Sequence, residues 1–594
     1  MEPITYYKSQ SEKHKHTLRQ YQKQRNFITI TKILIFAIIV WQIYIAINDG
    51  TPYFLYSLLV AIIAFIAMTR IDSKVVNHIR VTEALIRINE EENAYLQGDL
   101  SPFPAGKEYG HPSHPYACDL DLFGDDSLFR HLDRTVTHEG QRQLAEWLLT
   151  PCLQRQEILR RQEAVRELTT LPSWRQLFRA NGKTQKIQEI NTENLYQWQQ
   201  EPPFFHHKKR IRRILLFING CTIATWGCTI AGILPYPIPL LLSLSQLLAL
   251  SFLLKKINQY HNRLNTFISS ISNYLPLVRL LERQPFTSSH LQEIKKLLFQ
   301  DNQNALKALS SLKRIQEKLD QRGNLIAAFF LNGLYLRDMH TILDLDKWKE
   351  KYSACINQWT TAISQTDALA SMANFSFNHP EYTFPVISDN YQLNAEGIGH
   401  PLLQNKKCVT NDFAILREHQ MFIVTGANMA GKSTFLRTVG INLVLAQSGN
   451  VVRSARFDFH PTALFTSMRT TDNLAKDTSY FHAELLRLKQ LVEMAKQEHV
   501  FIILDEMLKG TNSVDKLNGS LAFLRKLLQY PVTGLIATHD LALGELANEY
   551  PENFFNVCFE ITHQGEEIQY DYKLHKGVST TMNASILLKQ MGLI

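Results

Sequence analysis

The sequence predicts an α/β domain with a phosphate-binding loop in its C-terminal third, a helical domain before it, and two transmembrane hairpins within the helical part. Three observations support this fold class. A G-x-x-x-x-G-K-S motif at residues 426–433 lies between an apolar run and a helical pattern. Four long apolar runs carry almost no charge and have basic residues at their outer ends. Most of the remaining sequence before residue 378 has the periodicity of amphipathic helices.

The composition is that of a chain with several domains. At 594 residues the chain is too long for one hydrophobic core. Its net charge of +8 is modest for this length and does not by itself indicate a nucleic-acid partner, because basic residues also orient membrane spans. The seven cysteines are scattered without a C-x-x-C pair. We therefore expect neither a disulfide framework nor a zinc site, which suits a reducing compartment.

The first predicted hairpin follows a basic N-terminal segment, residues 1–26. The runs 27–47 and 53–68 are each about long enough to cross roughly 30 Å of hydrocarbon at 1.5 Å per residue. Lys32 is the only charge in them and lies near the start of its run, where its side chain can reach the headgroups. Because the outer ends are basic and the turn at 48–52 is not, we expect both ends in the cytoplasm. A basic arm that contacts nucleic acid is the alternative for the first segment.

A second pair of apolar runs, 214–234 and 238–254, interrupts the helical domain. The basic segment 208–213 and the pair Lys255-Lys256 flank these runs, which repeats the charge pattern of the first hairpin. All soluble segments are therefore expected on the same side of the membrane. Small residues at three- and four-residue spacing in the first of these runs allow close approach of helices in lipid. Buried core helices are the alternative for all four runs.

Helices are predicted on both sides of the second hairpin. Residues 140–149 and 156–168 have amphipathic periodicity, with a break at Thr150-Pro151. Residues 257–370 form a long helical pattern with few breakers, typical of levers or coiled arms. The basic segment 307–314 could contact phosphate, but a solvated helix face is the favoured interpretation.

The motif at 426–434 is predicted to bind a nucleoside triphosphate. In such a loop, backbone N–H groups surround the phosphates at a helix N-terminus, the lysine reaches the β- and γ-oxygens, and the serine hydroxyl takes Mg²⁺. Lys432 and Ser433 fill those two positions. The predicted nucleotide-binding residues of the loop are Gly426, Ala427, Asn428, Met429, Ala430, Gly431, Lys432, Ser433 and Thr434.

Two further apolar runs end in candidate catalytic side chains. Asp505 and Glu506 end one run, and His539 ends another. Asp505 can hold Mg²⁺ through water, and Glu506 can orient the attacking water. The imidazole of His539 can sense a γ-phosphate, with a purely structural histidine as the alternative. A glycine-bearing loop is expected at 510–515.

The end of the chain is predicted to contain a β-hairpin and a helix. Residues 555–561 and 568–574 alternate between apolar and polar side chains, with Gln564-Gly565 at the turn. A helix is predicted at 582–591.

Several motifs together resemble the MutS family of DNA mismatch-repair ATPases. The resemblance covers residues from about 115 to 594, apart from the second hairpin, and is most specific in 420–540. The matching stretches are the phosphate loop 424–434, the acid motif 504–506 with Gly510, Thr511 and Asp515, the histidine motif 537–539, the helix start 477–484, and the upstream segments 119–124, 127–129, 134–140 and 400–403.

The resemblance implies an ABC-type α/β ATPase domain joined to an all-α core and lever. It implies ATP and Mg²⁺ as cofactors, DNA as partner, and a homodimer in which Ser479 contacts the γ-phosphate held by a partner subunit. Family members that read mismatches carry a Phe-x-Glu motif near the N-terminus, and this chain has none. The chain also stops about where the family often adds a C-terminal dimerisation motif, so we expect a dimer formed through the ATP sites, the core and the spans.

The predicted segments are a basic cytoplasmic N-terminus at 1–26, a first transmembrane hairpin at 27–69, the first part of the core at 75–207, a second transmembrane hairpin at 214–254, the lever with the second part of the core at 257–375, and the ATPase domain at 378–594. Two functions fit this order. One is a membrane-anchored, MutS-like ATPase that binds mismatched or branched DNA in an ATP-dependent manner. The other is a membrane ATPase that moves its spans without DNA, although the spans contain few ionisable residues to form a transport path. A scaffold with a degenerate ATPase is a third, disfavoured by the intact catalytic residues.

Overall fold

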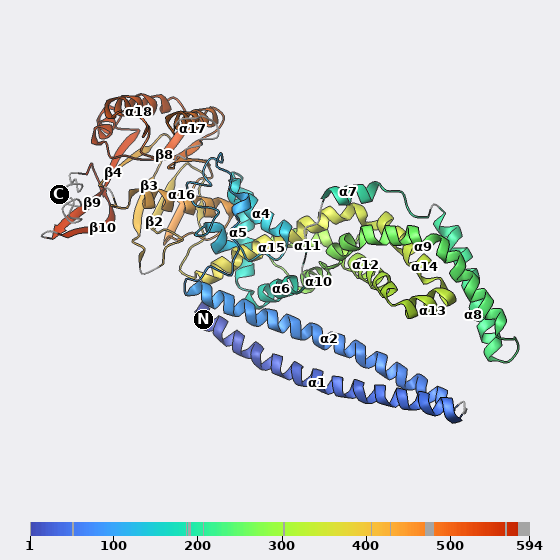
Figure 1. Cartoon of the computed structure of the whole chain (residues 1–594). Helices are drawn as coiled ribbons and strands as arrows, with labels where there is room; N and C mark the ends of the chain where they lie inside the picture. Colours follow the sequence, from blue (N-terminus) through green and yellow to red (C-terminus); the bar gives the residue numbers. More distant parts are fainter. Residues whose placement is uncertain are drawn as a thin grey trace.

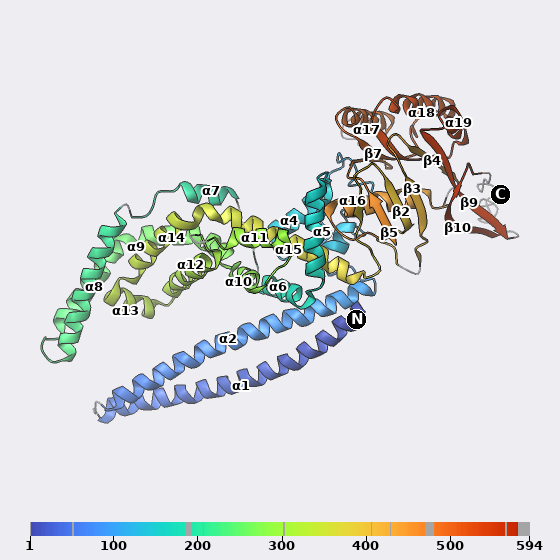
Figure 2. The ribbon, with the colours of Figure 1, turned by 180° about the vertical axis from the view of Figure 1, so that it is seen from behind.

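The computed structural model is an elongated molecule with an α/β part at one end and helices at the other (Figures 1 and 2). The C-terminal residues form the α/β part, and two long helical pairs extend from the rest of the chain. The structure describes residues 2–49, 53–185, 187, 192–205, 207–300, 303–404, 407–427, 429–469, 480–564 and 567–579.

The N-terminal segment and the first predicted hairpin form two long helices that lie side by side, α1 (Pro3–Asp49) and α2 (Tyr53–Leu96). Helix α1 passes through residue 26 without a break, so the basic leader and the apolar run share one helix. Lys32 Nζ of α1 lies 2.7 Å from Asp72 Oδ2 of α2. This ion pair joins the two helices near the point where both sequences become apolar.

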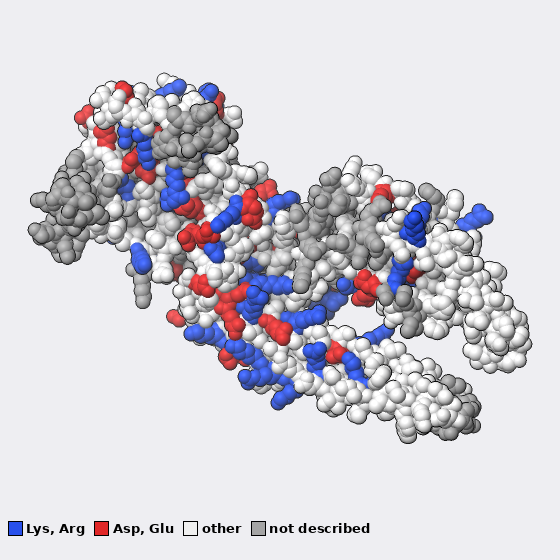
Figure 3. Space-filling view, in the orientation of Figure 1, with Lys and Arg blue, Asp and Glu red and all other residues white. Residues whose placement is uncertain are grey.

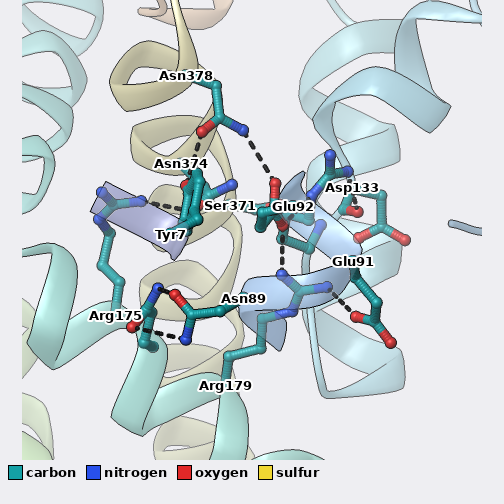
Figure 4. Close-up of polar contacts among 12 residues, drawn as sticks. Tyr7, Asn89, Glu91, Glu92, Asp133, Arg175, Arg179, Ser371, Asn374 and Asn378 are labelled. Carbon is teal, nitrogen blue, oxygen red and sulfur yellow. Dashed lines mark hydrogen bonds and ion pairs between the residues drawn. The ribbon is translucent and has the colours of Figure 1, made fainter. Parts of the chain in front are cut away.

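A buried polar network joins the base of the α1–α2 pair to the helical core (Figure 4). The Tyr7 hydroxyl donates to Asn378 Oδ1 at 2.6 Å. Glu92 Oε1 lies 2.6 Å from Arg134 Nε and 2.5 Å from Arg179 NH1. We call this group the hairpin-base network; its members are Tyr7, Glu91, Glu92, Arg134, Arg175, Arg179, Asn374 and Asn378.

Amphipathic helices form the core, as predicted. The two helices expected between residues 140 and 168 are confirmed as α4 (His138–Leu149) and α5 (Arg155–Thr169). The hydroxyl of Thr137 caps α4 by accepting the N–H of Gly140 at 3.0 Å. Both helices pack on α15 (Ile356–Asn378), whose residues are mostly buried. The other helices of this part are α3 (Leu128–Leu132), α6 (Pro172–Gln185), α7 (Thr192–Gln200), α10 (Leu275–Arg283), α11 (Ser289–Leu298), α12 (Ala305–Asp320) and α14 (Arg337–Tyr352).

The second predicted hairpin consists of α8 (Lys208–Ile230) and α9 (Pro237–Ser272), and α13 (Leu325–Tyr335) packs beside them. Among the described residues, three helical stretches are long and apolar enough to cross a membrane: Pro3–Ile45, Lys208–Ile230 and Pro237–Tyr260. The fourth predicted run, 53–68, lies in α2, and the side chains at its start are outside the described residues. The tips of both helical pairs point toward the same end of the molecule (Figure 1).

The C-terminal part contains two sheets. The larger has the strand order β10-β9-β4-β8-β7-β6, and every neighbouring pair in it is parallel except β10 with β9. The smaller has the order β1-β5-β2-β3. The strands are β1 (Val386–Ile387), β2 (Leu393–Ile398), β3 (Asn411–Ile415), β4 (Met421–Gly426), β5 (Arg456–Phe459), β6 (Ala463–Ser467), β7 (Val500–Asp505), β8 (Val532–Ala537), β9 (Phe554–Gln564) and β10 (Glu567–Lys576). The helices are α16 (Lys432–Ser448), α17 (Tyr480–Ala495), α18 (Ser513–Leu527) and α19 (Leu546–Glu549).

Two local predictions for this part can be compared with the structure. The C-terminal hairpin is confirmed, since β9 and β10 pair antiparallel with Ile561 opposite Tyr570. The prediction that the loop runs to residue 515 was wrong, because α18 begins at Ser513. The side chain of Asn512 accepts the N–H of Asp515 at 2.9 Å and so starts the helix earlier. The helix predicted at 582–591 lies outside the described residues.

Candidate functional site

The loop at 426–434 connects β4 to α16. Gly426 and Gly431 have φ values of 143° and 106°, which side-chain-bearing residues rarely adopt. A Cβ atom on Gly426 would lie 2.6 Å from the carbonyl oxygen of Phe559, so the loop also needs glycine for space. Asn428 lies outside the described residues. The two glycines let the chain turn tightly from the strand into the helix.

Lys432 is the first residue of α16, and its ammonium group lies inside the curve of the loop. Its Nζ donates to the carbonyl oxygens of Gly426 at 2.7 Å and Ala427 at 2.8 Å. Burial lowers the pKa of Lys432 to about 8, even though two nearby carboxylates act in the opposite direction. The helix N-terminus and this cation together favour an anion at the loop.

Ser433 and Asp505 meet although they lie on different elements. Ser433 Oγ donates to Asp505 Oδ2 at 2.6 Å. They meet because β7, which ends in Asp505, is separated from β4 by β8 alone, and all three strands are parallel. Hydroxyl and carboxylate oxygens are hard ligands of the kind that Mg²⁺ prefers, so the pair fits that ion.

Glu506 and His539 form the third contact of the site. Glu506 Oε1 lies 2.6 Å from His539 Nε2, and the Glu506 backbone has a positive φ of 51°. The hydrogen bond to His539 lowers the pKa of Glu506 to about 2, which outweighs the effect of partial burial. The other ring nitrogen, Nδ1, lies 3.4 Å from Lys432 Nζ. His539 therefore links the carboxylate to the lysine of the loop.

A cavity of about 470 Å³ opens beside these groups. Lys432, Ser433, Glu506 and His539 line one part of it, and the rest includes apolar and aromatic side chains. A volume of this size is typical of small-molecule sites. The lining residues that the sequence did not single out as site residues include Ile398, His400, Val409, Phe435 and Tyr572. Tyr572 belongs to the alternating residues of the C-terminal hairpin, and that alternation is the sequence signal that could have indicated its side of the strand.

Comparison with known families gives two matches. The family model for MutS domain III matches residues 119–373, and the model for MutS domain V matches residues 422–589. The chain belongs to the MutS family. The DNA mismatch repair protein MutS of Persephonella marina is 32% identical over 228 residues, which are 38% of this chain and 26% of that protein. The MutS protein homolog 4 of Homo sapiens is 28% identical over 239 residues, which are 39% of this chain and 25% of that protein. The matched region is thus about a quarter of each relative's length.

The start of the MutS domain III match lies directly on the MutS domain V part. Asp119 accepts the N–H of Arg469 at 2.8 Å and the hydroxyl of Thr466 at 2.6 Å. Asp121 lies 2.6 Å from Arg469 NH1 and 3.2 Å from NH1 of Arg437, which is on α16. The helix that begins at the loop is therefore joined to the start of MutS domain III by ion pairs.

Ser479, which the MutS resemblance assigns to a partner's nucleotide, lies outside the described residues. The helix that follows it, α17, is tied to the candidate site of its own chain. Glu484 in α17 accepts the N–H groups of Leu508 at 2.5 Å and Lys509 at 3.0 Å. The start of α17 therefore packs against the loop that follows Glu506.

Proposed function

We propose that the chain hydrolyses ATP with Mg²⁺ at the 426–434 loop. The observation that carries this proposal is the convergence of Lys432, the Ser433–Asp505 pair and the Glu506–His539 pair at the ends of adjacent parallel strands. Phosphoryl transfer needs little covalent chemistry from the protein, and its catalysis rests on positioning and charge neutralisation. The membership of the chain in the MutS family supports the same activity.

Each part of the site has one role in this proposal. Lys432 and the N-terminus of α16 bind the phosphate charge. Ser433 and Asp505 hold Mg²⁺, which supplies further positive charge at the phosphate oxygens. Glu506 is kept ionised by His539 and orients the attacking water. His539 contacts both Glu506 and Lys432, which places it where it can respond to a γ-phosphate.

The test is ATP turnover by the detergent-solubilised protein. Glu506→Gln is expected to bind ATP with near-normal affinity and to lose about 10²- to 10³-fold in turnover, because the carboxylate acts in the transition state. Glu498→Gln changes an exposed glutamate outside the site and should have no effect. A parallel loss of ATP binding in Glu506→Gln would contradict its assigned role.

The proposal includes anchoring in a membrane by the α1–α2 and α8–α9 pairs. Phe27 and Ile47 in α1 are 70% and 78% exposed, and Phe217 in α8 is 73% exposed. Apart from Asp49, the sequence of the outer ends of both pairs, residues 33–69 and 214–254, contains no acidic or basic residue. The described residues at both ends are white in Figure 3. Exposed apolar surface of this extent suits lipid and not water. The basic flanks support a topology in which both chain ends and the ATPase lie in the cytoplasm. A reporter at residue 1 or 594 that responds from outside would overturn this topology.

DNA is the proposed partner, in a homodimer with composite ATP sites. The relatives named for DNA mismatch repair support this choice. ATP turnover is measured with and without intact, mismatched and branched duplexes, and stimulation by any of them supports a DNA-binding function. Mixed dimers of Ser479→Arg with Lys432→Ala test the composite site. One site of each mixed dimer keeps both residues, so about half of the normal activity should return if Ser479 acts on a partner's nucleotide.

A membrane ATPase that moves its spans without DNA is the second candidate. The observation that favours it is the position of α8–α9, an apolar pair that lies within the residues 119–373 matched by MutS domain III. Under this alternative, ATP turnover depends on reconstitution in a bilayer and is unchanged by all three kinds of DNA.

A further inference from the structure

Helix α13 carries no charge and packs against α8 and α9. Its residues, Leu325–Tyr335, include no acidic or basic side chain, and Arg322 and Arg337 lie on either side of it. Its exposed apolar side chains are Phe329 (53%), Phe330 (60%), Leu331 (38%), Leu334 (39%) and Tyr335 (43%). Five such side chains within seven residues form an apolar surface of a kind that soluble proteins rarely leave in water.

The position of α13 relates it to the apolar part of α9. A Cβ atom on Gly333 would lie 3.6 Å from Leu247 Cδ1 and 3.8 Å from Ser243 Cβ. Leu247 precedes the basic pair at Lys255 by eight residues (255 − 247), which corresponds to about 12 Å along the helix. If α9 crosses the bilayer, the Gly333 end of α13 therefore lies at the depth of the acyl chains.

The charged residues that flank α13 pair with each other and with α9. Arg322 Nε lies 2.8 Å from Asp338 Oδ2, and Arg322 NH2 donates to Asn258 Oδ1 at 2.7 Å. Asn258 follows Lys255 in α9 by three residues (258 − 255). Leu336 has a positive φ of 45°, so the chain turns sharply between α13 and α14. The charged groups before and after the helix are thus paired with each other, and the helix between them is apolar.

We propose that α13 is a third lipid-contacting element, which enters the cytoplasmic leaflet beside α8–α9 without crossing the bilayer. Its 11 residues measure about 16 Å, roughly half of the hydrocarbon thickness. The occupant of its exposed face is the acyl-chain region, because α13 packs directly against the apolar helices α8 and α9. In both views of the ribbon α13 lies between the two helical pairs (Figures 1 and 2). The inference rests on the proposed anchoring of α8–α9.

Lipid photo-cross-linking of the full-length protein in nanodiscs of phosphatidylethanolamine and phosphatidylglycerol tests this assignment. Benzoylphenylalanine replaces Phe330 in one sample, Phe217 of α8 in a second and Tyr196 of α7 in a third. All three side chains are exposed, at 60%, 73% and 63% respectively, and all are aromatic, so the replacements are matched. Lipid adducts are expected at Phe330 and Phe217 and not at Tyr196.

The outcomes distinguish the two proposals. Adducts at Phe217 without adducts at Phe330 overturn the assignment of α13 and leave the anchoring of α8–α9 in place. Absence of adducts at Phe217 overturns the anchoring and the α13 assignment together. Equal adducts at Tyr196 and Phe330 also overturn the assignment, because Tyr196 lies on α7 among the soluble helices.

Discussion

The hairpin-base network and the 426–434 loop both gather charged side chains, but the two regions satisfy these charges differently. In the network, the Glu92 side chain is fully buried and is shared by two arginines, and Asn378 donates to its second oxygen at 2.9 Å. At the loop, Lys432 donates to neutral backbone carbonyls. Glu506 keeps 25% of its side chain exposed beside His539.

The comparison separates charges that hold the fold together from charges that can accept a ligand. Glu92 cannot change partners without leaving a buried guanidinium unpaired, which is costly in a low-dielectric interior. Lys432 can exchange carbonyl contacts for phosphate oxygens, because its hydrogen-bond partners among the described residues are neutral carbonyls and a ring nitrogen of His539. We therefore expect changes in the network to alter stability and changes at the loop to alter ligand binding.

The largest expected effect on stability comes from Glu92→Ala. This change leaves Arg134 buried without its carboxylate and leaves Arg179 with Glu91 alone, and it should destabilise the base of α1–α2 by about 3–5 kcal/mol. Hydrogen exchange of the α2 amides measures the local free energy of unfolding. Glu90→Ala is the matched control in the same helix, because the Glu90 side chain is 55% exposed and pairs only with Lys15 among the described ion pairs. Equal effects of the two changes would contradict the proposed difference.

Lys432→Ala should weaken ATP binding and change stability little, the reverse of what is expected for Glu92→Ala. ATP affinity should fall by about 10²-fold, because a charge-assisted contact to phosphate is lost. The free energy of unfolding should change by no more than about 1 kcal/mol, because no buried charge is left unpaired. Calorimetric ATP titration and thermal unfolding measure the two quantities, with exposed Lys489→Ala as the control. A large loss of stability would contradict this prediction and show that Lys432 stabilises the fold, as Glu92 is expected to do.

A smaller effect is expected from pH. Burial holds the pKa of Lys432 at about 8, and bound phosphate raises this pKa because it stabilises the ammonium form. ATP affinity should therefore be constant below about pH 8 and should fall by up to about tenfold per pH unit above it. Lys432→Arg removes this titration, since a guanidinium stays protonated. An equally steep fall in that variant would assign the pH dependence to another group.

The smallest expected effect comes from Tyr7→Phe. The change removes the hydroxyl that donates to Asn378 at 2.6 Å in a buried site, and the expected loss of local stability is about 1 kcal/mol. Tyr6→Phe is the control on the adjacent residue, whose hydroxyl makes an exposed contact of 3.3 Å to Ser173. Hydrogen exchange of the first turns of α1 should distinguish the two variants. An effect of Tyr6→Phe as large as that of Tyr7→Phe would argue that burial of the hydroxyl does not matter here.

The sequence by itself determined the features that depend on neighbouring residues. The loop between β4 and α16 follows from a motif of fixed spacing, and α4 and α5 follow from their apolar periodicity. The apolar runs of α1, α8 and α9 are long enough to recognise without a partner. Helix α13 lies within the helical pattern predicted for 257–370, but its apolar character was not singled out, because 11 residues are too few for a membrane span.

Only the tertiary structure decided which distant side chains meet. Ser433 follows β4 and Asp505 ends β7, and in the sheet these two parallel strands are only one strand, β8, apart. The sequence does not show this order, because β8 follows β7 along the chain. Tyr7 and Asn378 form a hydrogen bond although they lie 371 positions apart in the sequence. Periodicity indicates which face of a helix or strand is buried, but it carries no information on the partner of a buried polar group. Helix packing and strand order determine that partner, and here they close the hairpin-base network while leaving the loop open to a cavity.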